Sequence, residues 1–215
     1  MNIISLVSRT IIIPLALFIG VIPIESLTIN AQKGAQPKSK NENKVPLEQI
    51  TSVVRNQFGP KVRVSTSSEP FYLLGDFNGD GFSDIAVLIN IEEGREDLKS
   101  FGVKYINVDP YSRTNGSESD PVSGMGHNCL GIAVIHGTAD GWETNSPSAK
   151  YVFYECFSGF RIIRKGERIR RGTGSRGQTP LPKGDSIQID LESGGAALIY
   201  WDGKTYRGFG QRRGD

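Results

Sequence analysis

Oxygen-bearing side chains recur at short, regular intervals along residues 76–84. A calcium ion takes about six to eight oxygen ligands in a tolerant geometry, so one coiled segment can supply most of them. Gly79 and Gly81 lie between the candidate ligands, and glycine adopts the positive φ angles of a tight coil at little cost. The spacing therefore predicts a Ca²⁺ site. Its candidate ligands are the side chains of Asp76, Asn78, Asp80 and Asp84 and the carbonyl group of Phe82.

The residues after this loop exclude an EF-hand. An EF-hand loop of about twelve residues ends in a glutamate, whereas Val87 stands at the matching place, inside an apolar run. That run, residues 85–91, is typical of a buried strand. The alternative to a metal site is an Asp- and Gly-rich hairpin turn without an ion. In that case the carboxylates of the loop would repel one another.

Residues 75–87, Gly-Asp-Phe-Asn-Gly-Asp-Gly-Phe-Ser-Asp-Ile-Ala-Val, resemble the calcium loop of FG-GAP repeats, which build integrin-type β-propellers and occur in many bacterial surface proteins. The resemblance implies that Asp76, Asn78, Asp80 and Asp84 are ligands. A propeller needs about four or more blades, and this chain holds a single copy, so a propeller is not expected. The whole chain also resembles small secreted bacterial proteins of unknown function that end in a hairpin similar to residues 200–204.

Residues for catalysis are scarce. The chain has no Gly-x-Ser-x-Gly elbow and no glycine-rich phosphate loop followed by lysine, and His127 and His136 alone make a poor zinc site. We therefore expect a non-catalytic domain in which calcium is structural. The alternative is a metal-assisted hydrolase of unassigned substrate that uses the carboxylates of the same loop, which would require an open coordination position on the ion.

A basic segment spans residues 161–176 and holds one acidic residue, Glu167. It is a candidate for binding an anion such as a phosphate, an acidic glycan or a lipid head group. The alternative is a solvated loop or an edge strand guarded by charge. A net charge of +2 and the lack of interleaved aromatic residues argue against nucleic acid. The candidate anion-binding residues are Arg161, Arg164, Arg168, Arg170 and Arg171.

The N-terminus predicts export. Arg9 precedes an apolar run over residues 10–24, and Ala31 offers a cleavage site, so residues 1–31 are expected to be a signal peptide. The alternative is an uncleaved anchor. Residues 32–45 have little apolar content and predict a disordered tether. Residues 46–215 would then form a single domain in a secreted or periplasmic protein, with an anionic envelope component or a protein as its unidentified partner.

The two cysteines, Cys129 and Cys156, predict a disulfide in an exported chain. Residues 130–136 and 150–155 read as strands, and antiparallel pairing of these strands would place the cysteines opposite each other. The alternative is a pair of buried free thiols.

The remaining pattern predicts an α+β fold with mostly antiparallel sheet. A helix is expected over residues 46–58, with apolar residues on one face, between Pro46 and Gly59. Residues 109–128 predict a long mobile loop, and Asp202-Gly203 predicts a two-residue hairpin turn. Further strands are expected at residues 61–64, 71–74, 101–108, 186–191, 196–201 and 204–206, the last three forming a C-terminal meander.

Overall fold

The computed structural model describes residues 44–91, 97–118, 129–144, 147, 149–169, 179–191 and 195–211. Within it, Lys44–Asp215 forms a compact unit of its own. The predicted signal peptide at residues 1–31 and residues 32–43 of the predicted tether lie outside the described residues. No helix in the described part of the chain is both long and apolar enough to cross a membrane.

The first sheet has six strands and contains the long, mostly buried strand β3, which pairs with three neighbours. Its order is β1-β3-β5-β6-β4, with β2 also paired to β3, and all pairs are antiparallel except β4 with β6. β1 pairs with the end of β3 and β2 with its beginning, so the two short strands use successive parts of β3. The strands are β1 (Val62–Val64), β2 (Tyr72–Gly75), β3 (Asp84–Ile91), β4 (Lys104–Tyr105), β5 (Leu130–His136) and β6 (Ala149–Glu155).

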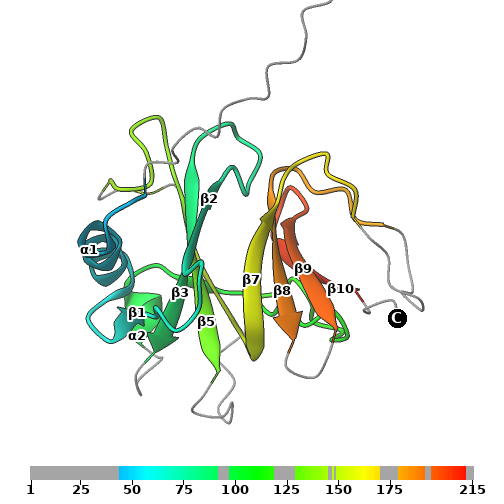
Figure 1. Ribbon diagram of the computed structural model, residues 1–215, viewed down its shortest axis with the longest axis horizontal. Coiled ribbons are helices and arrows are strands. Elements are labelled where there is room, and N and C mark those ends of the chain that lie inside the picture. Colours follow the sequence, from blue (N-terminus) through cyan, green and yellow to red (C-terminus); the bar gives the residue numbers. More distant parts are fainter. Residues whose placement is uncertain are drawn as a thin grey trace, which may run out of the picture. The chain divides into compact units, whose positions relative to one another are not determined.

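The second sheet is an antiparallel meander of four strands in the order β7-β8-β9-β10. Figure 1 shows it beside the first sheet, with β7 next to β2 and β3. The chain passes from one sheet to the other at Cys156, which alone separates β6 from β7. The strands are β7 (Phe157–Ile163), β8 (Ser186–Leu191), β9 (Ala196–Trp201) and β10 (Tyr206–Gln211).

The N-terminal helix α1 (Leu47–Phe58) confirms the predicted amphipathic face. Pro46 stands at its N-cap, and Gly59, with φ of 93°, ends it. Its buried apolar residues are Ile50, Val53, Val54 and Phe58. A second, one-turn helix, α2 (Asp97–Ser100), precedes β4.

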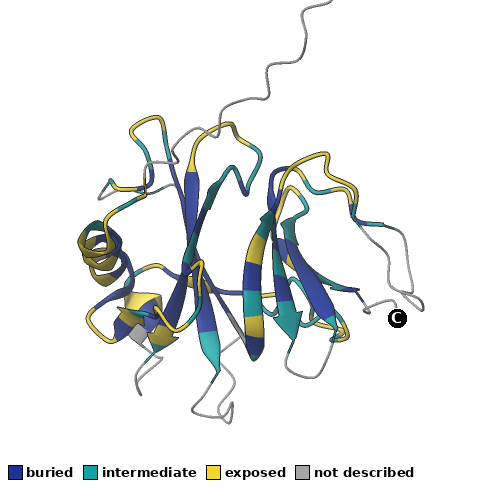
Figure 2. Cartoon of the chain, in the orientation of Figure 1, coloured by how far each residue is buried: buried dark blue, intermediate teal, exposed yellow. Residues whose placement is uncertain are grey.

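A single hydrophobic cluster joins the two sheets. It includes Ile85 and Val87 of β3 together with Ile187 and Ile199 of the second sheet, all with no exposed surface. Figure 2 shows the buried positions on the strands and the exposed positions mainly on α1 and the loops. Burial of a continuous apolar surface is the main favourable term in folding, so the sheets share one core.

The predicted disulfide is confirmed. Cys129 and Cys156 are bonded, with their Cα atoms 4.6 Å apart. The register explains why: β5 and β6 pair antiparallel, and Leu130 lies opposite Glu155, which places the flanking cysteines side by side.

The fold is mostly antiparallel β-structure with an N-terminal helix, and three details differ from the prediction. The strands form two sheets, since β7 starts a second layer. Of the strand predicted at residues 101–108, only β4 forms, and it pairs parallel to β6. The turn between β9 and β10 is not the two-residue type. It spans residues 202–205, because the Asp202 side chain accepts hydrogen bonds from the N–H groups of Lys204 and Thr205.

Candidate metal centre

The predicted calcium loop connects β2 to β3 and is closed by the last pair of their ladder, Gly75 with Asp84. Asp76 organises its first half. One carboxylate oxygen accepts the N–H of Gly79 at 2.7 Å and the other accepts the N–H of Gly81 at 3.0 Å. Gly79 and Gly81 have φ of 80° and 91°, as the sequence predicts for a tight coil.

Asn78 and Asp80 continue the coil by bonding to the backbone two residues ahead. The amide oxygen of Asn78 accepts the N–H of Asp80, and a carboxylate oxygen of Asp80 accepts the N–H of Phe82, each at 2.9 Å. The Asn78 amide also donates to Asp80 at 2.7 Å. Short polar side chains that bond their own backbone in this way favour turns over regular structure.

Asp84 is the buried member of the set, with no exposed surface. Its Oδ2 accepts the N–H groups of Phe77 at 2.7 Å and Asn78 at 3.3 Å, and its Oδ1 accepts the N–H of Gly137 at 2.8 Å. Burial raises the pKa of this carboxyl from 3.8 to about 7; the three N–H groups oppose that rise, and the charge of Asp80 adds to it. A nearby cation would favour the ionised form.

The chemistry of the donor set fits calcium. Every predicted donor is a hard oxygen, which calcium prefers. Oxygens of Asp76, Asn78 and Asp80 already accept one hydrogen bond each, and a carboxylate or amide oxygen keeps a second lone pair for a metal. When ionised, the fully buried carboxylate of Asp84 would place a negative charge at the base of the loop.

The side chains of the candidate calcium ligands do not converge on one point. Within the part of the chain that the structure describes, no group of three or more His, Cys, Asp or Glu side chains is arranged to hold a metal ion. The loop carboxylates instead face backbone N–H groups. Binding an ion would therefore require the exposed ligands to turn their oxygens toward a common point, about a backbone that is already coiled.

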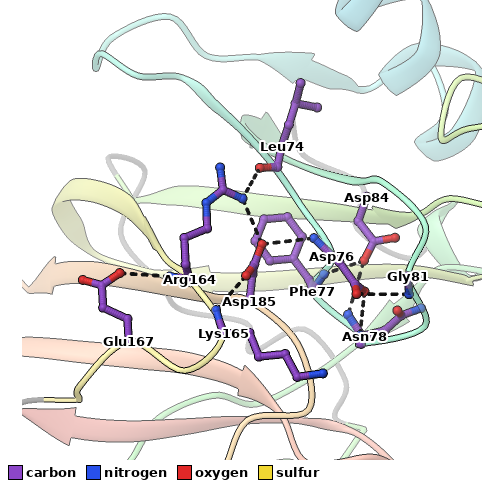
Figure 3. A network of polar contacts seen from close by, with 11 residues as sticks. Leu74, Asp76, Phe77, Asn78, Gly81, Asp84, Arg164, Lys165, Glu167 and Asp185 are labelled. Carbon is purple, nitrogen blue, oxygen red and sulfur yellow. Dashed lines mark hydrogen bonds and ion pairs between the residues drawn. The ribbon is translucent and has the colours of Figure 1, made fainter. Parts of the chain in front are cut away.

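Asp185, just before β8, joins the loop to the second sheet (Figure 3). The backbone N–H of Asp185 donates to the carbonyl of Asp76 at 2.7 Å, and the N–H of Asp76 donates back to Asp185 Oδ2 at 3.2 Å. Arg164 Nη1 forms an ion pair with the same oxygen at 2.9 Å, and the N–H of Lys165 donates to Oδ1 at 2.8 Å. One buried carboxylate thus ties three segments together.

Two glycines allow this close approach. A side chain at Gly79 would collide with the carbonyl of Lys183, and one at Gly184 would collide with the carbonyl of Asp76. The loop and residues 183–185 are therefore in backbone contact. We did not predict this contact from the sequence, and the Gly184-Asp185 pair just before a strand was the available signal.

Of the predicted anion-binding arginines, the structure shows polar contacts for Arg161 and Arg164 with the domain itself. Arg161 lies on the edge strand β7 and donates to Gln188 at 2.9 Å, as the charged-edge alternative suggested. Arg164 donates to the carbonyl of Leu74 at 3.2 Å as well as to Asp185. Arg168 is exposed, whereas Arg170 and Arg171 lie outside the described residues.

A buried cluster of aromatic rings lies between the two sheets and was not predicted as a unit. His136 Nε2 is 2.7 Å from the hydroxyl of Tyr206, and the rings of Tyr151 and Trp201 contact the imidazole. Burial lowers the pKa of His136 from 6.5 to about 4, while the charge of Asp80 opposes this. Burial first, and then Asp84, raises the pKa of Tyr206 well above 10. The cluster therefore adjoins the acidic loop.

Scans against protein-family models and searches of curated proteins and of solved structures find nothing that matches this chain. The likeness of residues 75–87 to an FG-GAP calcium loop therefore stays a prediction from those residues.

Proposed function

We propose that the chain is a secreted, non-catalytic α+β domain in which residues 76–84 bind a structural calcium ion. The observation that carries the proposal is the carboxylate of Asp84, which is fully buried beneath a loop of further oxygen donors. A buried carboxylate is costly unless it is paired or protonated. A divalent cation in the loop would stabilise its ionised form and offset the repulsion among Asp76, Asp80 and Asp84.

The contacts of the loop favour a structural role for the ion. The Asp76 backbone and the Asp185 carboxylate connect the loop to the second sheet. An ion that fixes Asp76 would also fix this connection between the sheets. The bonded pair Cys129 and Cys156 supports export, since disulfides persist in oxidising compartments. The proposed partner is an anionic component of the cell envelope or a protein.

The metal-assisted hydrolase is the weaker candidate. A catalytic ion needs an open position facing a substrate cleft. A cavity of about 230 Å³ lies between the end of α1, β1 and α2, and none of the residues that line it belongs to the loop. The loop instead packs against residues 183–185.

Calcium titration and thermal unfolding test the proposal. Isothermal calorimetry should detect uptake of calcium, and calcium at about a hundred times the dissociation constant should raise the melting temperature by about 5–10 °C over the chelated protein. Asp80→Asn removes one ligand charge and should weaken binding by roughly tenfold. Asp140→Asn removes an exposed carboxylate in the turn after β5 and should leave binding unchanged.

Two results would contradict the proposal. One is a lack of heat exchange at millimolar calcium with a melting temperature that does not respond to chelator. The other is equal weakening by Asp80→Asn and Asp140→Asn, which would indicate a general charge effect instead of a site.

A further inference from the structure

The chain contains two Asn-Gly pairs, Asn78-Gly79 in the candidate metal centre and Asn115-Gly116 in the loop after β4. In such a pair the backbone nitrogen of the glycine can attack the side-chain carbonyl carbon of the asparagine, because glycine has no side chain to hinder the approach. Ring closure releases ammonia, and water then opens the ring to leave a carboxylate. The two pairs are chemically identical, so a difference in their reactivity must come from the surrounding structure.

The contacts of Asn78-Gly79 place a polar group at each atom that would react. The N–H of Gly79 donates to Asp76 Oδ1 at 2.7 Å, so a carboxylate lies where it can accept the proton of the attacking nitrogen. The N–H of Asp80 donates to Asn78 Oδ1 at 2.9 Å, at the oxygen on which negative charge develops. The side-chain amine of Asn78, which is the leaving group, donates to Asp80 Oδ2 at 2.7 Å.

Two further features of the loop bear on the reaction. The carboxylates of Asp76 and Asp80 disfavour negative charge nearby, but the N–H of Asp80 acts on the carbonyl oxygen directly, at hydrogen-bond distance. Gly79 lies against the backbone of residues 183 and 184, so its nitrogen is held beside Asp76 and the Asn78 side chain supplies the movement. Asn78 is half-buried and Asp80 is exposed, so water reaches the site.

Asn115-Gly116 lacks this arrangement. The N–H of Gly116 donates to the carbonyl of Asn107 at 2.7 Å, and a backbone carbonyl is not a base that takes up the proton. The Asn115 side chain is held on β10, where its oxygen accepts the N–H of Gly208 at 2.8 Å and its amine donates to the carbonyl of Gly208 at 2.7 Å. Folding should therefore slow the reaction at Asn115.

We propose that Asn78 is a site of self-catalysed deamidation in the calcium-free loop. The proton of the Gly79 nitrogen passes to Asp76 as the bond from that nitrogen to Asn78 Cγ forms. It returns through water to the side-chain amine as the Cγ–Nδ2 bond breaks and ammonia leaves. Water then adds to either carbonyl of the succinimide ring and leaves aspartate or isoaspartate at position 78, with no oxidant or reductant involved.

Calcium should suppress this reaction. An ion bound by Asp76 and Asn78 would occupy the oxygens that the reaction uses, and only this part of the inference rests on the proposed function. In the isoaspartate product the backbone runs through the former side chain and is longer by a methylene group, so the loop oxygens lose their spacing. A chain aged without calcium should therefore lose calcium uptake in proportion to its isoaspartate content.

Peptide mapping by mass spectrometry tests the proposal on the full chain. The protein is incubated with chelator at neutral pH, either folded or unfolded in guanidinium chloride, and conversion at Asn78 and Asn115 is followed over time. General base catalysis should make Asn78 react roughly a hundredfold faster in the folded than in the unfolded protein. Asn115 should react more slowly when folded. A folded rate at Asn78 equal to or below its unfolded rate would overturn the proposal.

A variant of the base provides a second test. Asp76→Asn keeps an oxygen that accepts hydrogen bonds but removes the carboxylate, and should lower the folded rate at Asn78 by roughly a hundredfold without changing the unfolded rate. Glu143→Gln removes an exposed carboxylate in the turn after β5 and should leave both rates unchanged. Slow conversion at Asn115 verifies that each variant is folded. If Asp76→Asn does not fold, the comparison of folded and unfolded wild type still decides.

The failures of the two proposals are distinguishable. Calcium uptake by calorimetry without slower conversion at Asn78 would overturn the deamidation mechanism, because the ion should remove Asp76 as the base, and would leave the calcium site intact. A lack of calcium uptake would overturn the proposed function. The ratio of folded to unfolded rates at Asn78, which is measured without an ion, would remain the test of deamidation.

Discussion

His136 lies between the two sheets as a buried imidazole, 3% exposed. The titratable groups that face it are Tyr151, Tyr206 and, through its charge, Asp80. Its pKa falls from 6.5 to about 4 because burial disfavours the charged ring. The unfolded chain therefore binds a proton below pH 6.5 that the folded protein does not bind until about pH 4. The contribution of His136 to the free energy of unfolding should therefore decrease as the pH falls from 6.5 to about 4.

We predict that His136→Gln changes the pH dependence of stability. The wild-type free energy of unfolding should fall, relative to that of the variant, by about 3 kcal/mol between pH 6.5 and pH 4. Urea unfolding at several pH values measures the difference. Tyr206→Phe is the control, because it removes the hydrogen bond but keeps the imidazole buried, so its pH dependence should match that of wild type. Parallel pH profiles for wild type and His136→Gln would contradict the burial argument.

At the scale of elements, the outer edge of β10 is covered by the loop that follows β4. The Asn115 amide donates to the carbonyl of Gly208 at 2.7 Å and its oxygen accepts the N–H of Gly208 at 2.8 Å. One side chain thus replaces a neighbouring strand. Residues 109–118 belong to the segment predicted as a mobile loop, but this contact holds them against the second sheet. Unpaired strand edges promote association between molecules, so covering this edge protects the meander.

Asn115→Ala should lower the free energy of unfolding by about 1–3 kcal/mol, because two hydrogen bonds to a strand edge are lost. Asn115→Asp keeps the acceptor and loses the donor, so its loss should be intermediate. Chemical denaturation compares the three proteins. An alanine variant that is as stable as wild type would contradict the prediction, even if the aspartate variant is less stable than both. It would show that the Asn115 amide does not cover the edge of β10.

At the scale of the whole molecule, the two sheets should unfold together because they share one hydrophobic cluster and the contacts of Asp185. The chain has two tryptophans, and both take part in this shared core. Trp142 follows β5 of the first sheet, and Trp201 ends β9 of the second. The ring of Trp201 also contacts His136 and Tyr151 of the first sheet, so Trp142 reports on the first sheet and Trp201 on the packing between the sheets.

We predict that Trp142→Phe and Trp201→Phe each unfold in a single transition, in which fluorescence of the remaining tryptophan coincides with far-ultraviolet circular dichroism. A fluorescence midpoint that precedes the dichroism midpoint in either variant would show that the sheets are separate cooperative units. Chelation of calcium should lower both midpoints together if the loop holds the sheets to each other.

The local pattern of the sequence was sufficient to predict many of the elements of this protein. The apolar stripe of residues 47–58 predicted α1, and the branched apolar run of residues 85–91 predicted β3, because these periodicities reflect burial of one face or of both. The spacing of Asp76, Asn78 and Asp80 predicted a loop coiled around an ion, and in the structure these side chains bond to the backbone of the coil. The flanks of Cys129 and Cys156 predicted the disulfide through strand pairing.

Tertiary structure alone decided the contacts between distant segments. The Gly184-Asp185 pair before β8 signals a close backbone approach but does not identify Asp76 and Arg164 as the partners of Asp185, and His136 gave no sign of its contact with Tyr206. These pairs form because the meander turns back as a second sheet after Cys156, and packing of two layers brings together residues whose separation along the chain carries no periodic signal. The sequence by itself determined which residues of the 76–84 loop could hold an ion. Only the packing of the two sheets decided that this loop contacts Asp185.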